Sequence, residues 1–454
     1  MNALVTVAAF VIALAVLIVI HEYGHYLVAK LAGVRVLRFS VGFGKSVWMR
    51  RLGADGTEWA VGVVPLGGYV KMLDEREGPV GPQELHRAFN RQPVWKRFAI
   101  VSAGPIANFV LAIALYWLLF LHGVPEAKPV IGAPEPGSVA AAAGLQRGDT
   151  IRKINGEGVA TWQDLRWQLL KLAVDRLPAR LEILDQNRRI EWRTLDMAKF
   201  VAEGFEGDPL ARVGLRLYRP DVEPVIGKVM AGSVAERAGL RAGDRVTAVD
   251  QKPIRTWEEL VASVRAHPGE KLILEVRREG ERITVAATPE VAEQNGERFG
   301  RIGAAPRVDP QAMKSFVTSV SYGPGDALKL ALVRTWDTAL FSLKMLGKML
   351  VGEVSWKNLS GPVTIADYAG QSAQLGLAPY IAFIALISIS LGVLNLLPIP
   401  LLDGGHLMYY VVEIVKGSPV SERVMELGQR LGLSLLLFLM AFAFYNDINR
   451  LVSG

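Results

Sequence analysis

The chain contains no cysteine in its 454 residues, which excludes disulfide bonds, cysteine-based zinc sites and a thiol nucleophile. Long stretches also lack aspartate, glutamate, lysine and arginine, at residues 2–20, 98–125 and 369–402. Hydrophobic residues make up 51% of the chain, which is high for a soluble protein and low for a pure membrane bundle. We therefore expect a few membrane spans joined to a soluble insert. The net charge of +7 fits membrane topology, and no nucleic-acid partner is expected.

The pattern H-E-x-x-H at residues 21–25 follows directly on the first uncharged stretch. On a helix, His21 and His25 lie one turn apart on one face, so both imidazoles can bind the same metal ion. Glu22 projects beside them and can take a proton from a water molecule. Ionisable side chains in an apolar helix of membrane length are costly to desolvate and indicate a functional site. A chance match is the alternative, but chance does not explain why the pattern ends a membrane span.

The basic segment at 31–97 sets the expected topology. Lysine and arginine outnumber acidic residues there, and the positive-inside rule makes such a loop cytoplasmic. The N-terminus then lies outside the cytoplasm. No basic residue and no small-residue cleavage site accompany the first apolar stretch, so we expect a retained transmembrane helix at 1–30.

Within the basic segment, residues 58–72 alternate strand-forming residues with glycine around a P-L-G-G turn, which predicts a β-hairpin. An ordinary structural hairpin is one interpretation. The other is an edge strand that pairs with an extended substrate backbone. The candidate substrate-binding residues are Val61, Val63, Val64, Gly67, Gly68, Tyr69 and Val70.

The second uncharged stretch predicts a transmembrane helix at 98–125 and contains the sequence G-P-I-A-N at 104–108. Proline and asparagine within a span break or polarise the helix, and protein groups or a cavity must satisfy the freed polar groups. For Asn108 an interhelical hydrogen bond is the simplest interpretation.

Residues 126–220 and 221–307 are two copies of one domain. The segment from Gly137 to Asp149 matches the segment from Gly232 to Asp244, and the same offset continues to Trp162 and Trp257. Each copy predicts a short helix, a tight A-G-L-x-x-G-D turn, a strand, a turn and a second helix. These motifs resemble the PDZ domain in its bacterial protease-associated form. PDZ grooves bind a peptide end by adding a strand to a sheet, although spacer domains with vacant grooves would look the same in sequence.

The C-terminal third is expected to contain amphipathic helices at 308–368 and transmembrane helices at 369–412 and 427–449. Four spans place the two-copy insert and both termini outside the cytoplasm. They also bring Asp403 to the depth of the two histidines, and two imidazoles with one carboxylate leave a tetrahedral zinc ion one open position. His406 is the rival third ligand, but a lone carboxylate in the membrane needs a partner. Asn395 can hydrogen-bond the substrate carbonyl or cap the broken helix.

Three motifs together resemble the site-2 protease family of intramembrane zinc metalloproteases, peptidase family M50. They are H-E-x-x-H in the first span, G-P-x-x-N in the second and N-x-x-P-x-P-x-L-D-G-G in the third. The layout with paired PDZ domains is similar to the bacterial branch of the family that regulates sigma-E. The resemblance implies a polytopic α-helical membrane protein with four transmembrane helices, a membrane-associated β-hairpin region and an inserted tandem pair of PDZ (α+β) domains.

The resemblance also implies a site and a setting. It implies one Zn²⁺ per chain held by His21, His25 and Asp403, with Glu22 as general base and Asn395 assisting substrate binding. Implied substrates are single-span membrane proteins such as anti-sigma factors, with signal-peptide remnants as further candidates. The expected location is the bacterial inner membrane, with the PDZ domains periplasmic and the active site toward the cytoplasm.

Two other classes of function share parts of this pattern. A non-catalytic membrane scaffold would use the PDZ domains to hold peptide tails, but the intact metal-binding pattern speaks against it. A transporter is disfavoured because no inverted repeat of spans is visible.

Overall fold

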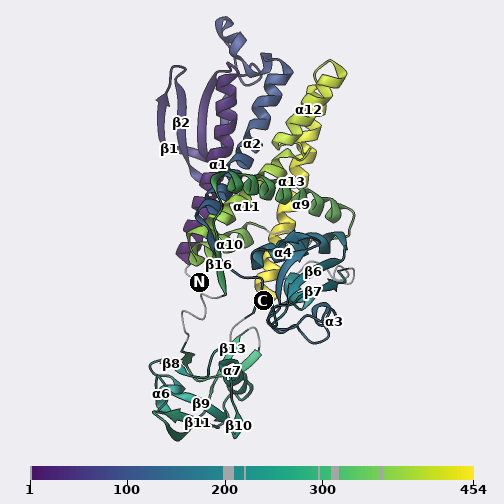
Figure 1. The fold of residues 1–454 in the computed structure, drawn as a ribbon. Coiled ribbons are helices and arrows are strands. Elements are labelled where there is room, and N and C mark those ends of the chain that lie inside the picture. The colour runs from purple at the N-terminus through teal and green to yellow at the C-terminus, as the bar shows by residue number, and fades with distance from the viewer. Residues whose placement is uncertain are drawn as a thin grey trace. The chain divides into compact units, whose positions relative to one another are not determined.

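The computed structural model describes residues 3–197, 209–218, 221–294, 297–307, 316–356 and 361–453 (Figure 1). The chain forms two compact units. The first runs to Val124 and resumes at Ser319, and the second lies between them in sequence, from Pro125 to Thr318.

Within the described part of the chain, four helices of the first unit are long and apolar enough to cross a membrane. They are α1 (Ala3–Leu31), α2 (Val94–His122), α11 (Leu377–Leu396) and α13 (Glu422–Ser453). The first two and the last correspond to the spans expected at 1–30, 98–125 and 427–449.

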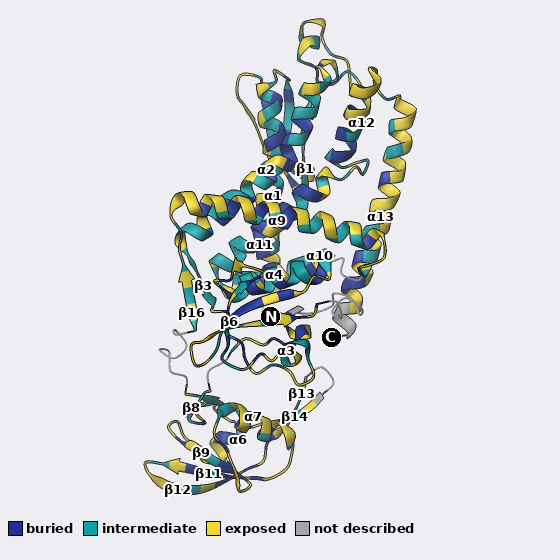
Figure 2. Ribbon diagram, turned by 45° about the vertical axis from the view of Figure 1, so that its right-hand side comes forward, coloured by how far each residue is buried: buried dark blue, intermediate teal, exposed yellow. Residues whose placement is uncertain are grey.

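The spans pack through small residues and a few polar contacts. A Cβ added at Gly24 of α1 would lie 2.4 Å from the backbone oxygen of Ala103 in α2, so these helices cross at backbone distance. The Tyr380 hydroxyl of α11 donates a 2.6 Å hydrogen bond to the Ala9 carbonyl of α1. In Figure 2 the buried residues lie where α1, α2 and α11 face one another, whereas α13 is mostly exposed. An exposed apolar helix face suits contact with lipid.

The region expected as one span at 369–412 is instead divided among three helices. These are the end of α10 (Pro362–Leu375), α11, and most of α12 (Asp403–Lys416). The division has a local cause, because Pro398 and Pro400 lack the backbone N–H that a continuing helix needs. A Cβ at Gly404 would lie 2.1 Å from the Leu397 carbonyl oxygen, so glycine lets the first turn of α12 pack against the loop.

The C-terminal helix contacts other elements at two places. Asp447 of α13, 2% exposed, accepts hydrogen bonds from the Gly361, Val363 and Thr364 amides at the start of α10. In the first half of α13, a Cβ at Gly432 would lie 2.1 Å from the Pro400 carbonyl oxygen. The carboxylate thus satisfies the free amides of a helix N-terminus in another element.

The amphipathic region expected at 308–368 contains α9 (Pro324–Leu350) and the start of α10. Residues 308–315 and 357–360 of that region lie outside the described residues. The buried face of α9 carries small residues such as Ala327 and Ala331, and its exposed residues include Trp336 and Leu340.

The basic segment forms a sheet from two long strands, β1 (Val36–Leu52) and β2 (Thr57–Met72), each of which contributes two segments. Residues 36–41 pair with 58–61 on one side and with 68–72 on the other, and 57–62 also pair with 46–52. The hairpin predicted within 58–72 is therefore wrong in its pairing, because β1 lies between its two arms. The outer segments of the sheet are 46–52 and 68–72.

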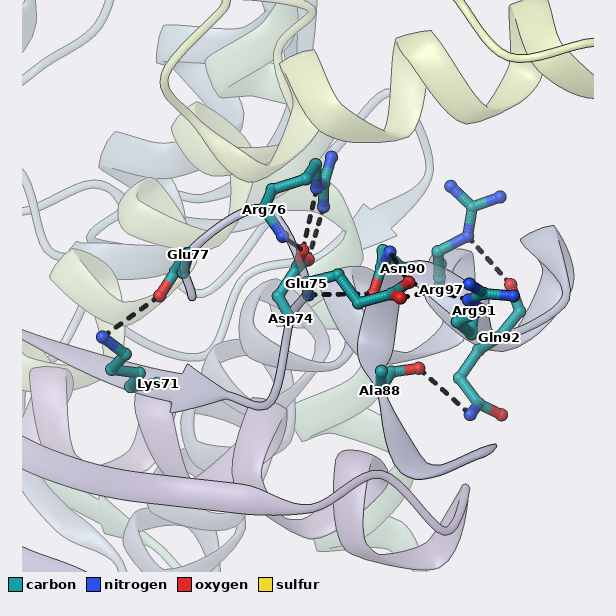
Figure 3. Close-up of polar contacts among 10 residues, drawn as sticks. All are labelled: Lys71, Asp74, Glu75, Arg76, Glu77, Ala88, Asn90, Arg91, Gln92 and Arg97. Carbon is teal, nitrogen blue, oxygen red and sulfur yellow. Dashed lines mark hydrogen bonds and ion pairs between the residues drawn. The ribbon is translucent and has the colours of Figure 1, made fainter. Parts of the chain in front are cut away.

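Two 3-10 helices, η1 (Pro82–Arg87) and η2 (Phe89–Arg91), follow the sheet. Figure 3 shows how polar contacts fix this connection. Asp74 accepts from the Arg76 guanidinium at 2.6 Å, and Glu75 accepts from Asn90 at 2.8 Å and from Arg91 at 2.7 Å. These contacts hold the chain between the outer strand 68–72 and the start of α2.

The second unit contains the two copies, and each holds a four-stranded sheet of the same strand order, β5-β4-β6-β7 or β10-β9-β11-β12. The first copy consists of α3 (Val139–Ala142), β4 (Thr150–Ile154), β5 (Glu157–Gly158), α4 (Trp162–Asp175), β6 (Ala179–Leu184), β7 (Ile190–Leu195) and α5 (Pro209–Val213). The second consists of β8 (Ile226–Val229), α6 (Val234–Arg237), β9 (Arg245–Val249), β10 (Lys252–Pro253), α7 (Trp257–Ala266), β11 (Leu272–Arg278), β12 (Glu281–Ala287), β13 (Glu290–Gln294), β14 (Glu297–Arg301) and β15 (Ala304–Pro306). The chain enters and leaves the insert through the paired strands β3 (Val124–Ala127) and β16 (Val317–Val320).

The repeated sequence motifs perform the same local tasks in both copies. Thr161 and Thr256 cap the second helices. Asp149 and Asp244 each accept a 2.8 Å hydrogen bond from the backbone amide three residues earlier. Burial raises the pKa of Asp149. Burial also acts to raise the pKa of Asp244, but hydrogen bonds from Arg278 outweigh it and hold that pKa below its usual range.

Candidate metal centre

Three side chains predicted as metal ligands converge in the first unit. His21 and His25 stand one turn apart on α1, and Asp403 is the first residue of α12. The His21 Nε2 atom lies 3.3 Å from His25 Nε2, and the Asp403 Oδ2 atom lies 3.1 Å and 3.5 Å from these two nitrogens. The rival third ligand, His406, is not part of this cluster of described residues.

This triangle fits a zinc ion. Tetrahedral zinc with bonds of about 2.0–2.1 Å separates its ligand atoms by about 3.3–3.4 Å, which is the spacing found here. The Asp403 Oδ2 atom is buried and receives no hydrogen bond from a described residue, so a cation is the partner its chemistry requires. Three protein ligands leave the fourth tetrahedral position open, as in catalytic sites.

Helix α2 packs against the two imidazoles. The Nδ1 atom of His25 lies 2.8 Å from the Ile100 carbonyl oxygen, which directs Nε2 toward the other two ligand atoms. A Cβ at Gly104 would lie 2.3 Å from His25 Nε2, so a larger residue cannot occupy that position. This role of Gly104 does not follow from the sequence alone, although a glycine beside a proline in an uncharged span is a visible signal.

Glu22 lies on α1 between the two histidines in sequence and is half-buried. Its Cγ atom would be 2.9 Å from a Cβ added at Gly68, so the outer strand of the sheet touches the candidate base. The base and the outer strand thus share one site.

The other candidate residues fall into two groups. Gly68, Tyr69 and Val70 lie in the outer segment 68–72, next to α1. Val61, by contrast, belongs to an inner segment paired on both sides, so it cannot add a strand. Val61, Val63 and Val64 expose 42%, 61% and 42% of their surface, and Gly67, with φ of 153°, turns the chain beside the Phe43 ring.

Asn395 is the penultimate residue of α11 and is half-buried. The contact between Gly404 and the Leu396–Leu397 backbone returns the chain to the end of α11 just after Asp403. That turn keeps Asn395 in the same part of the unit as the metal ligands, and its role stays a prediction.

Two imidazoles and a carboxylate with metal-ligand spacing, an adjacent glutamate and apolar spanning helices are the features of a membrane-embedded metallohydrolase. Residues 9–439 match Peptidase family M50, and the chain belongs to this family. It is 44% identical to the Regulator of sigma-E protease RseP of Salmonella typhimurium (strain 14028s / SGSC 2262) over 98% of both chains. It is also 44% identical to the Putative zinc metalloprotease NMA0084 of Neisseria meningitidis serogroup A, over 98% of this chain and 99% of that one.

Among solved structures, the PDZ domain of the SdrC-like protein from Listeria innocua matches 19% of this chain and 96% of its own length, with 16% identity and a TM-score of 0.17. The family and the full-length relatives, not this likeness, establish the activity. The chain is an intramembrane zinc metalloprotease with zinc as its cofactor, and the non-catalytic scaffold is not favoured.

Proposed function

We propose that this protease cleaves single-span membrane proteins at a zinc ion held by His21, His25 and Asp403. The observation that carries the ligand assignment is the triangle of two Nε2 atoms and one Oδ2 atom, with sides of 3.1–3.5 Å. Its three corners come from both ends of the chain, which chance proximity does not explain.

We propose distinct tasks for the chain's own residues around this ion. Bound zinc supplies Lewis acidity that activates water and polarises a peptide carbonyl. Glu22 accepts the proton of the attacking water and passes it to the leaving amine. Asn395 donates a hydrogen bond to the carbonyl oxygen as negative charge develops on it.

We further propose that residues 68–72 hold the substrate. Peptide bonds in a helix are shielded by their own hydrogen bonds, so the substrate must be extended locally before cleavage. An outer strand has unpaired backbone groups that can bond such a segment. The contact between Gly68 and Glu22 supports this, because a chain paired to that strand would pass beside the base. The exposed Val61, Val63 and Val64 would contact lipid or substrate side chains.

Residues 126–220 and 221–307 are proposed as tandem PDZ domains on the periplasmic side, with both termini also periplasmic and the active site toward the cytoplasm. The charge pattern of 31–97 and the repeated strand order of the two copies support this arrangement. We propose that the paired domains limit the size of the substrate's outer part, and that their grooves are a second place for peptide ends to bind.

The biological substrate class follows from the relatives. One of them is named as a regulator of sigma-E, so we propose that this chain trims anti-sigma factors in the bacterial inner membrane during envelope stress. Signal-peptide remnants are further candidates, because they too are short apolar helices.

The decisive experiment compares Glu22→Gln with wild type in detergent, with zinc content and cleavage of a single-span peptide measured side by side. Glutamine has nearly the same shape but cannot accept the proton, so turnover should fall at least about 100-fold with zinc retained. His21→Ala is the matched variant that should lose zinc as well. Near wild-type turnover by Glu22→Gln would remove the general-base role, and zinc bound normally by His21→Ala would remove the ligand assignment.

A further inference from the structure

Asn108 of α2 has no exposed surface and lies against the first histidine. Its Nδ2 atom is 3.2 Å from His21 Nδ1, while its Oδ1 atom is buried with no hydrogen-bond partner among the described residues. A buried amide oxygen without a donor is costly. Asn108 therefore has an unused acceptor next to a candidate metal ligand.

The Nδ1 atom of His21 needs a hydrogen-bond acceptor when Nε2 binds the metal ion. Its Nε2 atom is the one that faces His25 and Asp403. A neutral imidazole that binds a metal through Nε2 carries its proton on Nδ1 and must donate it. The amide NH₂ group cannot accept that proton, whereas Oδ1 can, and a half-turn of the amide exchanges the two atoms within the same volume.

The second histidine already shows the matching arrangement. His25 Nδ1 lies 2.8 Å from the Ile100 carbonyl oxygen, which can only accept. Ile100, Gly104 and Asn108 are spaced four residues apart and so lie along one face of α2. Gly104, in the middle, leaves the room that the two rings occupy.

We propose that Asn108 is a positioning residue, which accepts a hydrogen bond from the Nδ1–H of His21 and thereby turns Nε2 toward zinc. Helix α2 then orients both imidazoles, one through a backbone carbonyl and one through a side-chain amide. Helix α11 contacts the same residue at its backbone, where the Ser388 hydroxyl donates a 2.8 Å hydrogen bond to the Asn108 main-chain carbonyl and leaves the side-chain amide free to turn. The inference rests on the proposed ligand role of His21.

The test measures zinc affinity of the full-length protein in detergent, by competition with a chelator, for Asn108→Leu and Asn108→Asp. Leucine keeps the volume but removes the acceptor, and affinity should fall about 10- to 100-fold. Aspartate keeps the acceptor, so its affinity should equal or exceed that of wild type. Ser388→Ala is the matched control, since it loosens the same residue without touching the amide, and it should change affinity less than about threefold.

Equal losses for Asn108→Leu and Asn108→Asp would overturn the proposal, because packing alone would then explain the residue. If the leucine variant does not fold, nitrogen-15 spectra of labelled histidine in the zinc-loaded wild type decide instead. They should show a solvent-protected proton on His21 Nδ1, and a rapidly exchanging proton would contradict the inference. Failure of the ligand assignment is distinguishable, since His21→Ala would then leave zinc affinity unchanged.

Discussion

Gly68 is the residue through which the sheet touches the proposed base. A Cβ there would lie 2.9 Å from Glu22 Cγ and 3.0 Å from Ile18 Cγ2, so Gly68→Ala must displace the base or the strand. We expect turnover to fall more than about tenfold with zinc content unchanged, because small displacements of catalytic groups lower the reaction rate strongly. Gly78→Ala is the control, since nothing lies within 4 Å of its Cβ position. Equal activity of the two variants would separate the outer strand from catalysis.

Asp55 makes the stability of the basic segment 31–97 depend on pH. Hydrogen bonds from Lys30 and Arg87 lower the pKa of Asp55 to about 2, from an ordinary value of 3.8. A lowered pKa in the folded state adds stability above pH 4, and this contribution is lost as the pH falls toward 2. Asp55→Asn should therefore cost about 1 kcal/mol at pH 7, from two partly exposed ion pairs, and nearly nothing at pH 2. Thermal unfolding of both proteins from pH 2 to pH 7 measures this, and a constant difference would contradict it.

The ionisable residues of the candidate site can be predicted from the sequence more easily than its uncharged residues. His21, Glu22 and His25 have a fixed spacing on a helix, and Asp403 is a lone carboxylate after an apolar run, so pattern and desolvation cost both mark them. Gly104 and Gly68 matter because they have no side chain, which leaves room for groups of another element. The sequence of a single segment does not show which groups those are. The contact between Asn108 and His21 joins two helices and could not be distinguished in sequence from any other interhelical bond.

At the scale of elements, one ion pair joins α2 to the helix that carries Asp403, the proposed third ligand. The Arg97 guanidinium of α2 lies 2.6 Å from the Glu413 carboxylate of α12, and both side chains are 15% exposed. Removing one partner leaves the other charge partly buried and without its counter-charge, whereas removing both partners leaves no unpaired charge. Arg97→Gln or Glu413→Gln should each cost about 2 kcal/mol of stability and weaken zinc binding, and the double variant should cost less than their sum. Additive losses in chelator-titrated unfolding would show that the pair does not hold α12.

The element boundaries also show where sequence patterns fall short. Apolar length predicts α1 and α2 well, because membrane thickness sets the length of both. The expected span at 369–412 is divided because two prolines and two glycines outweigh continued hydrophobicity. The hairpin at 58–72 was paired wrongly since local turn signals cannot reveal that 36–41 inserts between its arms.

For the whole molecule, the insert is the part whose removal is most informative. The strands β3 and β16 pair where the chain enters and leaves it, and the Lys128 amide bonds the Phe316 carbonyl at 2.9 Å. Residues 129–315 can therefore be replaced by a short glycine-serine turn without pulling the first unit apart. With the insert as a size filter, the shortened enzyme should cut a substrate that keeps its bulky outer domain, while the rate on a trimmed one changes less than about threefold.

The rival view treats the PDZ grooves as essential tethers for a new chain end. It predicts that the shortened enzyme loses the trimmed substrate and gains nothing with the untrimmed one. Measuring both reactions with both enzymes, at matched zinc content, separates the two views.

The separation of the ligands along the chain also has a consequence for biosynthesis. His25 leaves the ribosome early, but Asp403 follows only after the whole insert has been made. At synthesis rates of about 5–20 residues per second, roughly 20–80 s pass between the synthesis of His25 and that of Asp403. During that interval the nascent protein has its base and two imidazoles but no complete centre. With zinc held as we propose, proteolytic activity therefore begins only when the polypeptide is nearly finished.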